Sequence, residues 1–104
     1  MTEIDPAASQ AATIEPCWLV EATYAPDGAE SRTPFRAAHI AHLGELIAAG
    51  RVVEAGAYVD VSSSVMIVRA ASEDEALDLF RSDVYLRNGV WVELRARPFG
   101  RVKV

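Results

Sequence analysis

Apolar residues recur with helical spacing in residues 33–50, and this period predicts an amphipathic helix. Thr33 can cap the first free amides, Pro34 has no N–H to lose at the next position, and Gly50 supplies the stop. Wound at about 100° per residue, the segment places one set of residues on its apolar face: Arg36, His39, Ile40, Leu43, Leu46 and Ile47. His39 therefore lies among apolar side chains, whereas His42 falls at the edge of the stripe, where water can reach it.

Shorter apolar runs, several of them alternating with polar residues, predict four strands around this helix. The predicted strands are residues 17–24, 51–61, 65–70 and 90–99. In the first strand, Trp18 and every second residue to Tyr24 share one face. The second and third form a hairpin through the serines between them. In the last, one predicted face holds Trp91, Glu93, Arg95 and Arg97, and the other holds Val90, Val92, Leu94 and Ala96.

A second helix follows Ser72, which begins a capping-box pattern with Glu75. Asp83 comes three residues after Phe80 at the end of this helix, so its carboxylate is predicted to point toward the side that packs on the sheet. A carboxylate at a helix C-terminus is unfavourable for the helix dipole. Asp83 must therefore accept a nearby N–H, pair with a cation, or cap the turn that follows.

The predicted order of strand, helix, strand, strand, helix, strand is that of an α+β, ferredoxin-like βαββαβ domain. Its four-stranded antiparallel sheet carries two helices on one face. The other face would expose Leu19, Trp91 and their neighbours, so we expect a homodimer in which the open faces of two copies meet. Residues 1–15 lack a periodic apolar face and are expected to be a disordered leader to a domain at 16–104.

The composition sets limits on the partners of this chain. Its 104 residues include 51% apolar and 24% charged residues with a net charge of −5, which opposes binding to nucleic acid. No apolar run approaches the roughly 20 residues of a membrane helix, and the N-terminus lacks a signal-peptide pattern. These features predict a cytoplasmic protein that contacts no membrane.

Metal and redox chemistry find little support in the sequence. The single Cys17 opens a predicted strand and is interpreted as a small buried apolar residue. His39 and His42 are three residues apart, but the sequence shows no further ligands that would complete a zinc site. We therefore expect no metal and no cofactor.

His39 itself has two readings. It can be a packed imidazole whose N–H is bound by a carbonyl, or it can face a pocket as a neutral base. In the second case apolar walls and the nearby Arg36 both disfavour the imidazolium form. The spacing alone does not decide between these two readings.

The sequence resembles the YciI-like (YCII-related) family, small proteins of the dimeric α/β-barrel type. The resemblance rests on RAAHIAHLGELIAAGRVVEAG and on SEDEALDLFRSDVYLRNGVWVELRARPF, and it covers about residues 17 to 100. Val84 and Ala57 stand where the family usually has proline. The resemblance implies a histidine and an aspartate that form an acid–base site beside the sheet, at His39 and Asp83.

The resemblance includes a few enzymes, and these perform elimination, dehalogenation or isomerisation of small cyclic or aromatic compounds without a cofactor. Such chemistry needs one base near neutral pKa, an orienting carboxylate and a cavity. Our hypothesis is that His39 is the base and Asp83 orients it, while Arg36 or Tyr85 holds an anionic oxygen of the ligand.

Two other functions are compatible with the sequence. The dimer could be a non-catalytic module that binds a small molecule or docks on a partner enzyme, in which case the space beside His39 and Asp83 would be filled. It could also be a cofactor-free monooxygenase or cyclase on the same barrel fold, with a large cavity along Trp91, Glu93 and Arg95.

Overall fold

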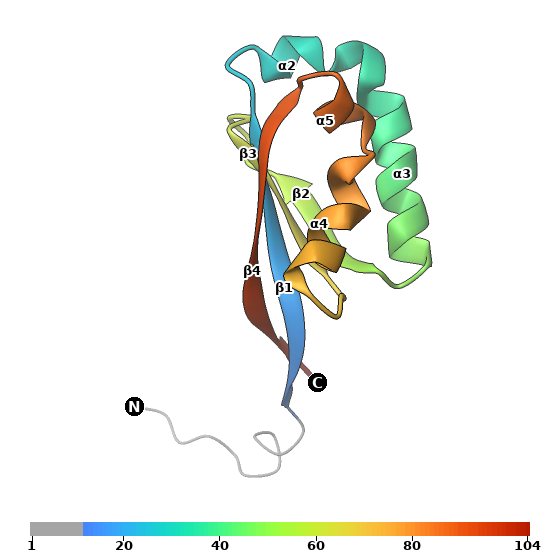
Figure 1. Ribbon diagram of the computed structural model, residues 1–104, viewed down its shortest axis with the longest axis vertical. Helices are drawn as coiled ribbons and strands as arrows, with labels where there is room; N and C mark the ends of the chain where they lie inside the picture. Colours follow the sequence, from blue (N-terminus) through green and yellow to red (C-terminus); the bar gives the residue numbers. More distant parts are fainter. Residues whose placement is uncertain (1–11) are drawn as a thin grey trace.

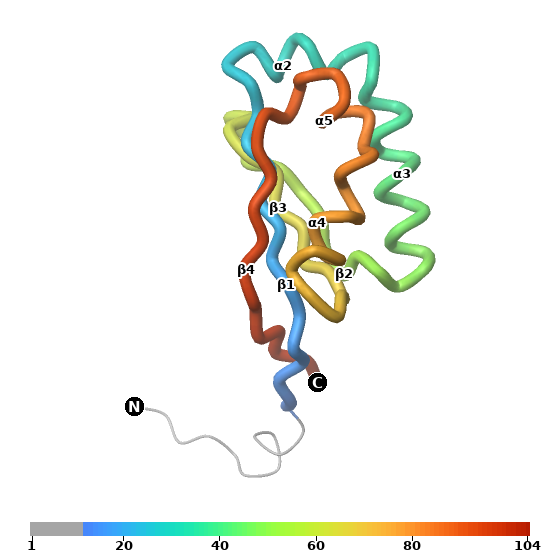
Figure 2. Tube along the Cα trace, in the orientation of Figure 1, coloured from blue at the N-terminus to red at the C-terminus, as the bar shows by residue number. Residues whose placement is uncertain are grey.

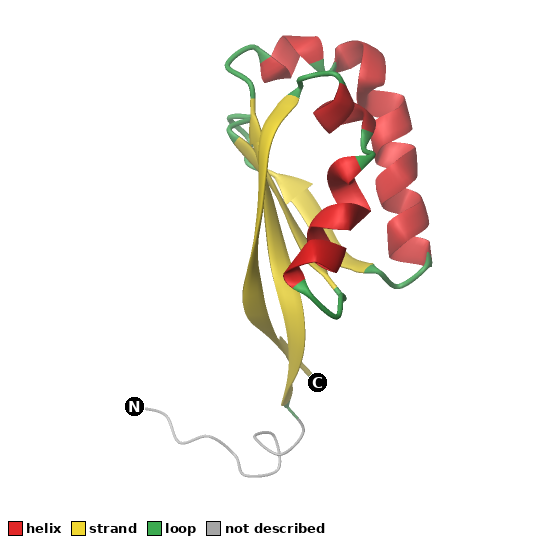
Figure 3. Cartoon of the chain, in the orientation of Figure 1, coloured by secondary structure: helices red, strands yellow, loops and turns green. Residues whose placement is uncertain are grey.

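The computed structural model describes residues 12–104, in which one sheet carries all of the helices on one side (Figures 1 and 3). The strands are β1 (Thr13–Tyr24), β2 (Val52–Ala57), β3 (Ser63–Val68) and β4 (Trp91–Lys103). The helices are α2 (Gly28–Ser31), α3 (Arg36–Ala48), α4 (Glu73–Arg81) and α5 (Val84–Arg87). The sheet order is β2-β3-β1-β4 and every pair is antiparallel. The predicted α+β, ferredoxin-like fold is confirmed.

The two longest strands lie side by side along their whole length (Figure 2). β4 runs on to Lys103, and this residue pairs with Thr13 at the start of β1. Residues 13–15, which the sequence analysis assigned to a disordered leader, are therefore strand, because the longer β4 supplies backbone partners for them. Residues 1–11 of the predicted leader lie outside the described residues.

The start of α3 differs from the prediction. Thr33 is the first residue of a short 3-10 turn, Thr33–Phe35, and makes no side-chain cap, while α3 itself begins at Arg36. The inward face of α3 is also narrower than predicted, since Ile40 and Ile47 are 53% and 49% exposed. Among the described residues, no helix is long and apolar enough to cross a membrane.

The end of α3 is the predicted one. Gly50 has a φ of +75°, and the N–H of the following Arg51 donates to the carbonyl of Leu46 at 2.9 Å. This is the Schellman pattern that favours glycine. The same helix also contains Gly44 at an ordinary helical position, where an added Cβ would meet nothing within 4 Å.

These two glycines give a matched prediction. Gly50→Ala is expected to lower the free energy of unfolding by about 1 kcal/mol, because alanine is strained at positive φ. Gly44→Ala is expected to raise it by about 0.5–1 kcal/mol, because alanine is the better helix former. Urea denaturation of both variants checks the signs, and two changes of the same sign would contradict the described helix end.

The last strand contains a correction to the predicted pattern of faces. The register shifts between Thr23, which pairs with Glu93, and Tyr24, which pairs with Trp91. Val92 is therefore an extra residue, and it is 59% exposed. This bulge turns Trp91 to the helix side, where it is 0% exposed. The prediction that Trp91 lies on the open face with Glu93 is wrong.

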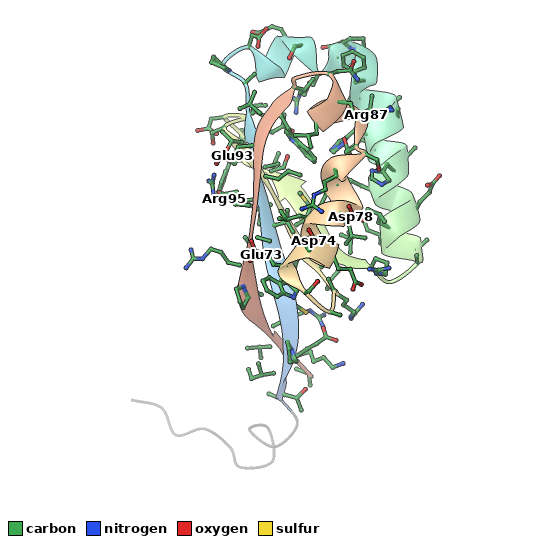
Figure 4. All side chains as sticks on the ribbon, viewed as in Figure 1. Glu73, Asp74, Asp78, Arg87, Glu93 and Arg95 are labelled. Carbon is green, nitrogen blue, oxygen red and sulfur yellow. The ribbon has the colours of Figure 1, made fainter. Side chains whose placement is uncertain are left out.

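The helix side of the sheet contains the core. Its largest fully buried side chains include Trp91, Tyr85, Phe80 and Met66. Glu93 and Arg95 project on the opposite side, away from the helices (Figure 4). That open face has a hollow of about 220 Å³, lined by Leu19, Glu21, Tyr58, Val65, Arg95 and Arg97. Trp91 cannot line a cavity on this face together with Glu93 and Arg95, the arrangement that would favour a monooxygenase or cyclase, because Trp91 faces the core.

Candidate functional site

Asp83 lies between the two helices that follow β3. α4 ends at Arg81, and Asp83 is the N-cap of α5, with an extended backbone and a side chain that accepts the N–H of Tyr85 at 2.8 Å. The sequence analysis treated Asp83 as the unfavourable end of one helix, but the structure shows that it begins the next one. A carboxylate at a helix N-terminus is stabilised by the free N–H groups and by the dipole. Two of the expected alternatives are therefore observed at once, since Asp83 caps the following turn by accepting a nearby N–H.

His39 reaches the same carboxylate from α3. Its Nδ1 lies 2.9 Å from Asp83 Oδ1 and 3.0 Å from Oδ2. The imidazole stacks on the Tyr85 ring, with centroids 3.7 Å apart and an interplanar angle of 11°. The Trp91 ring lies nearly perpendicular to the imidazole, with centroids 4.9 Å apart. The structure thus brings together the two residues predicted to form the acid–base pair, one from α3 and one from the start of α5.

His42 is part of the same cluster, and the sequence analysis did not predict its contact with Asp83. Its Nδ1 lies 2.9 Å from Asp83 Oδ2, so two imidazoles one turn apart bind one carboxylate. The sequence analysis expected only contact with water, and 27% of the His42 side chain is indeed accessible, against 5% for His39. The signal was the three-residue spacing itself, because residues i and i+3 of a helix share a face.

The charges in this cluster follow from its hydrogen bonds. Burial on its own raises the pKa of Asp83, but hydrogen bonds from the two imidazoles and from a backbone N–H outweigh it and hold the pKa below its ordinary value. An ionised carboxylate only accepts, so the Nδ1 atoms of His39 and His42 both donate. In a neutral imidazole this tautomer leaves the lone pair on Nε2, the atom that can act as a base.

Tyr85 and Arg36, the two predicted ligand-binding residues, occupy different environments. Tyr85 is buried against His39, and burial raises the pKa of its phenol, which therefore stays protonated as a donor. Arg36 is exposed at the first residue of α3 and forms no hydrogen bond with His39 or Asp83. Its positive charge still acts on the Tyr85 phenol, whose pKa it lowers in opposition to burial.

A pocket of about 200 Å³ opens on the outer side of Asp83. It is lined by Ala38, His42, Ser82, Asp83, Val84 and Arg87. His39 does not line it, because Tyr85 and Trp91 cover most of that ring. Within residues 12–104, no group of three His, Cys, Asp or Glu side chains is arranged to hold a metal ion.

Comparisons with known proteins agree with this fold and also identify a matching family. A YCII-related domain matches residues 17–100. A protein of Emericella nidulans, "Derivative of benzaldehyde biosynthesis cluster protein C", is 36% identical over 83 residues, which are 69% of this chain and 85% of that protein.

A solved structure provides a similar fold. The 5-chloro-2-hydroxyhydroquinone dehydrochlorinase of Burkholderia phenoliruptrix, in complex with 2,5-dihydroxybenzoquinone, superposes with a TM-score of 0.69. The alignment covers 80% of this chain and 92% of that one at 22% sequence identity.

Proposed function

The chain belongs to the YCII-related family, and we propose that it is a cytoplasmic, cofactor-independent acid–base enzyme for a small cyclic or aromatic compound. The reaction class is that of a lyase, isomerase or dehalogenase. The observation that carries this proposal is the ionised, buried Asp83 that accepts Nδ1–H from His39 at 2.9 Å. That contact fixes the tautomer in which Nε2 is the basic atom.

Each predicted residue has a role in this proposal. His39 takes a proton from a carbon or hydroxyl of the ligand, and Asp83 orients the ring and stabilises the imidazolium that forms. The protonated Tyr85 phenol donates to an oxygen on which negative charge develops, and the charge of Arg36 favours the same anion. Because only 5% of the His39 side chain is accessible, this role requires the aromatic rings packed on it to shift when the ligand binds.

The names of the similar proteins support the ligand class. The solved dehydrochlorinase holds a dihydroxybenzoquinone, and the Emericella protein is named for a cluster that makes a benzaldehyde derivative. Both names refer to oxygenated aromatic or quinonoid rings. A ring that carries a hydroxyl beside the reacting carbon suits a mechanism with one base and one phenol donor.

Turnover of chlorinated and unchlorinated hydroxyhydroquinones tests this proposal, with ultraviolet absorbance and chloride release as readouts. His39→Asn and Asp83→Asn are expected to lower kcat/KM by about 10²–10⁴-fold, the usual contribution of an acid–base group. Glu45→Gln, at an exposed position of the same helix, is the matched control. Folded His39 and Asp83 variants that turn over every accepted compound like the parent would refute the assignment. A parent protein that binds these compounds and converts none would instead be a binding module.

We also propose that the open face of the sheet binds a second copy of the chain. The support is its exposed apolar surface, including Val92 and Phe99 at 59% and 37% exposure, and the hollow beside Leu19. Sedimentation velocity is expected to show a dimer, and a monomer at all concentrations would exclude this arrangement.

A further inference from the structure

The two imidazoles on Asp83 differ in what lies beyond them. His39 is enclosed by aromatic rings, whereas His42 lines the pocket on the outer side of the carboxylate. Asp83 borders this pocket, but its side chain is 0% accessible and both of its oxygens already accept hydrogen bonds. A ligand in the pocket therefore contacts His42 instead of the Asp83 carboxylate oxygens.

The pocket also contains a cation and a hydroxyl group. Arg87 projects from the last turn of α5 next to α3, and it is exposed (Figure 4). Ser82 adds a hydroxyl, while Ala38 and Val84 supply small apolar walls. A guanidinium presents parallel N–H donors that match a carboxylate, and it binds planar oxyanions better than a simple point charge does.

Protonated His42 would complete this donor set. In that form Nδ1–H donates to Asp83, and Nε2–H is free to donate to a ligand. The charged groups that face His42 are Asp83 from the start of α5, Arg87 from its end and His39 from the same helix.

We propose that His42, Arg87 and Ser82 form a binding site for a small organic carboxylate, beside the His39–Asp83 pair. This inference deepens the proposed function. It rests on that function only in taking His39 as the group that reacts with the ligand. The anion binds between the Arg87 guanidinium and His42 Nε2–H, so that only the His42 ring separates it from Asp83. The site therefore favours ligands that carry a carboxylate.

A titration of the parent protein with benzoate, monitored by the side-chain NMR signals of histidine and arginine, tests this site without any turnover. Saturable shifts are expected at the side chains of His42 and Arg87. His42→Asn, which keeps an N–H for Asp83, and Arg87→Gln are each expected to weaken binding at least tenfold. Arg51→Gln removes a half-buried arginine that lines a different pocket, and this variant should bind benzoate like the parent.

The contrary results are equally defined. Absence of saturation at either side chain, or equal affinity in Arg87→Gln and Arg51→Gln, would overturn the site. Inorganic phosphate that shifts the same signals as strongly as benzoate would overturn the assignment to carboxylates. Benzoate binding without turnover of any ring compound would leave this inference standing and remove the proposed function, and turnover without benzoate binding would do the reverse.

Discussion

Asp83→Ala is expected to lower the free energy of unfolding by about 3–5 kcal/mol. The variant loses the N-cap of α5, which is typically worth about 1 kcal/mol. It also loses hydrogen bonds to a charged group, worth about 1.5–3 kcal/mol each and not fully additive. Since the Asp83 side chain is 0% accessible, no water replaces these bonds. Chemical denaturation measures the loss directly.

Asp78→Ala is the matched control for this prediction. Asp78 also accepts a side-chain hydrogen bond, from Arg81 at 3.3 Å, but its side chain is 71% accessible. Exposed ion pairs contribute about 0–1 kcal/mol, so this variant should stay within 1 kcal/mol of the parent. Equal losses in the two variants would mean that Asp83 is not held as described.

The loss in Asp83→Ala should also depend on pH. Folding lowers the pKa of Asp83 from its ordinary value of 3.8, so the stabilisation is present above that value and is lost as the pH falls through the folded pKa. The parent and the variant should therefore converge in stability as the medium is acidified below about pH 4. A constant difference between them down to pH 2 would contradict an ionised Asp83.

Trp91→Ala is the second change with a large expected effect, a loss of about 3–5 kcal/mol, as is usual for a buried aromatic residue. The indole is 0% exposed and packs against Tyr24, Phe80 and Tyr85. Because Trp91 also forms one wall of the His39 site, the variant should loosen that ring as well, which appears as a more accessible His39 in NMR.

The neighbouring Val92 supplies the control. It is 59% exposed at the bulge, and Val92→Ala is expected to change stability by no more than about 0.5 kcal/mol. A strand without the bulge would place these two residues the other way round, with the valine inward. A larger loss in Val92→Ala than in Trp91→Ala would therefore reject the register of β4.

The fold could be predicted from the sequence because its signals are local. The periods of α3 and β1, the serine cap of α4 and the glycine after α3 each depend on residues close together in the chain. Ser72 accepts the N–H of Glu75 at 3.1 Å, as the capping box predicts. These elements in this order leave few alternatives to a ferredoxin-like domain.

What the sequence did not reveal depends on contacts between distant segments. The bulge that turns Trp91 inward is set by pairing of β4 with β1, and regular alternation does not predict it. The pairing of His39 with Asp83 was implied by the family resemblance, since 44 residues separate them. His42 was missed because its partner is the second oxygen of a carboxylate whose orientation only α5 determines.

The double role of Asp83 bears on how relatives of this chain are to be compared. This one carboxylate both starts a helix and holds the imidazoles, so a relative without the proposed chemistry would still use the aspartate for folding. Retention of the acid across a set of sequences is therefore a mark of architecture. Retention or loss of the two rings that it holds is the better guide to which members share the proposed acid–base site.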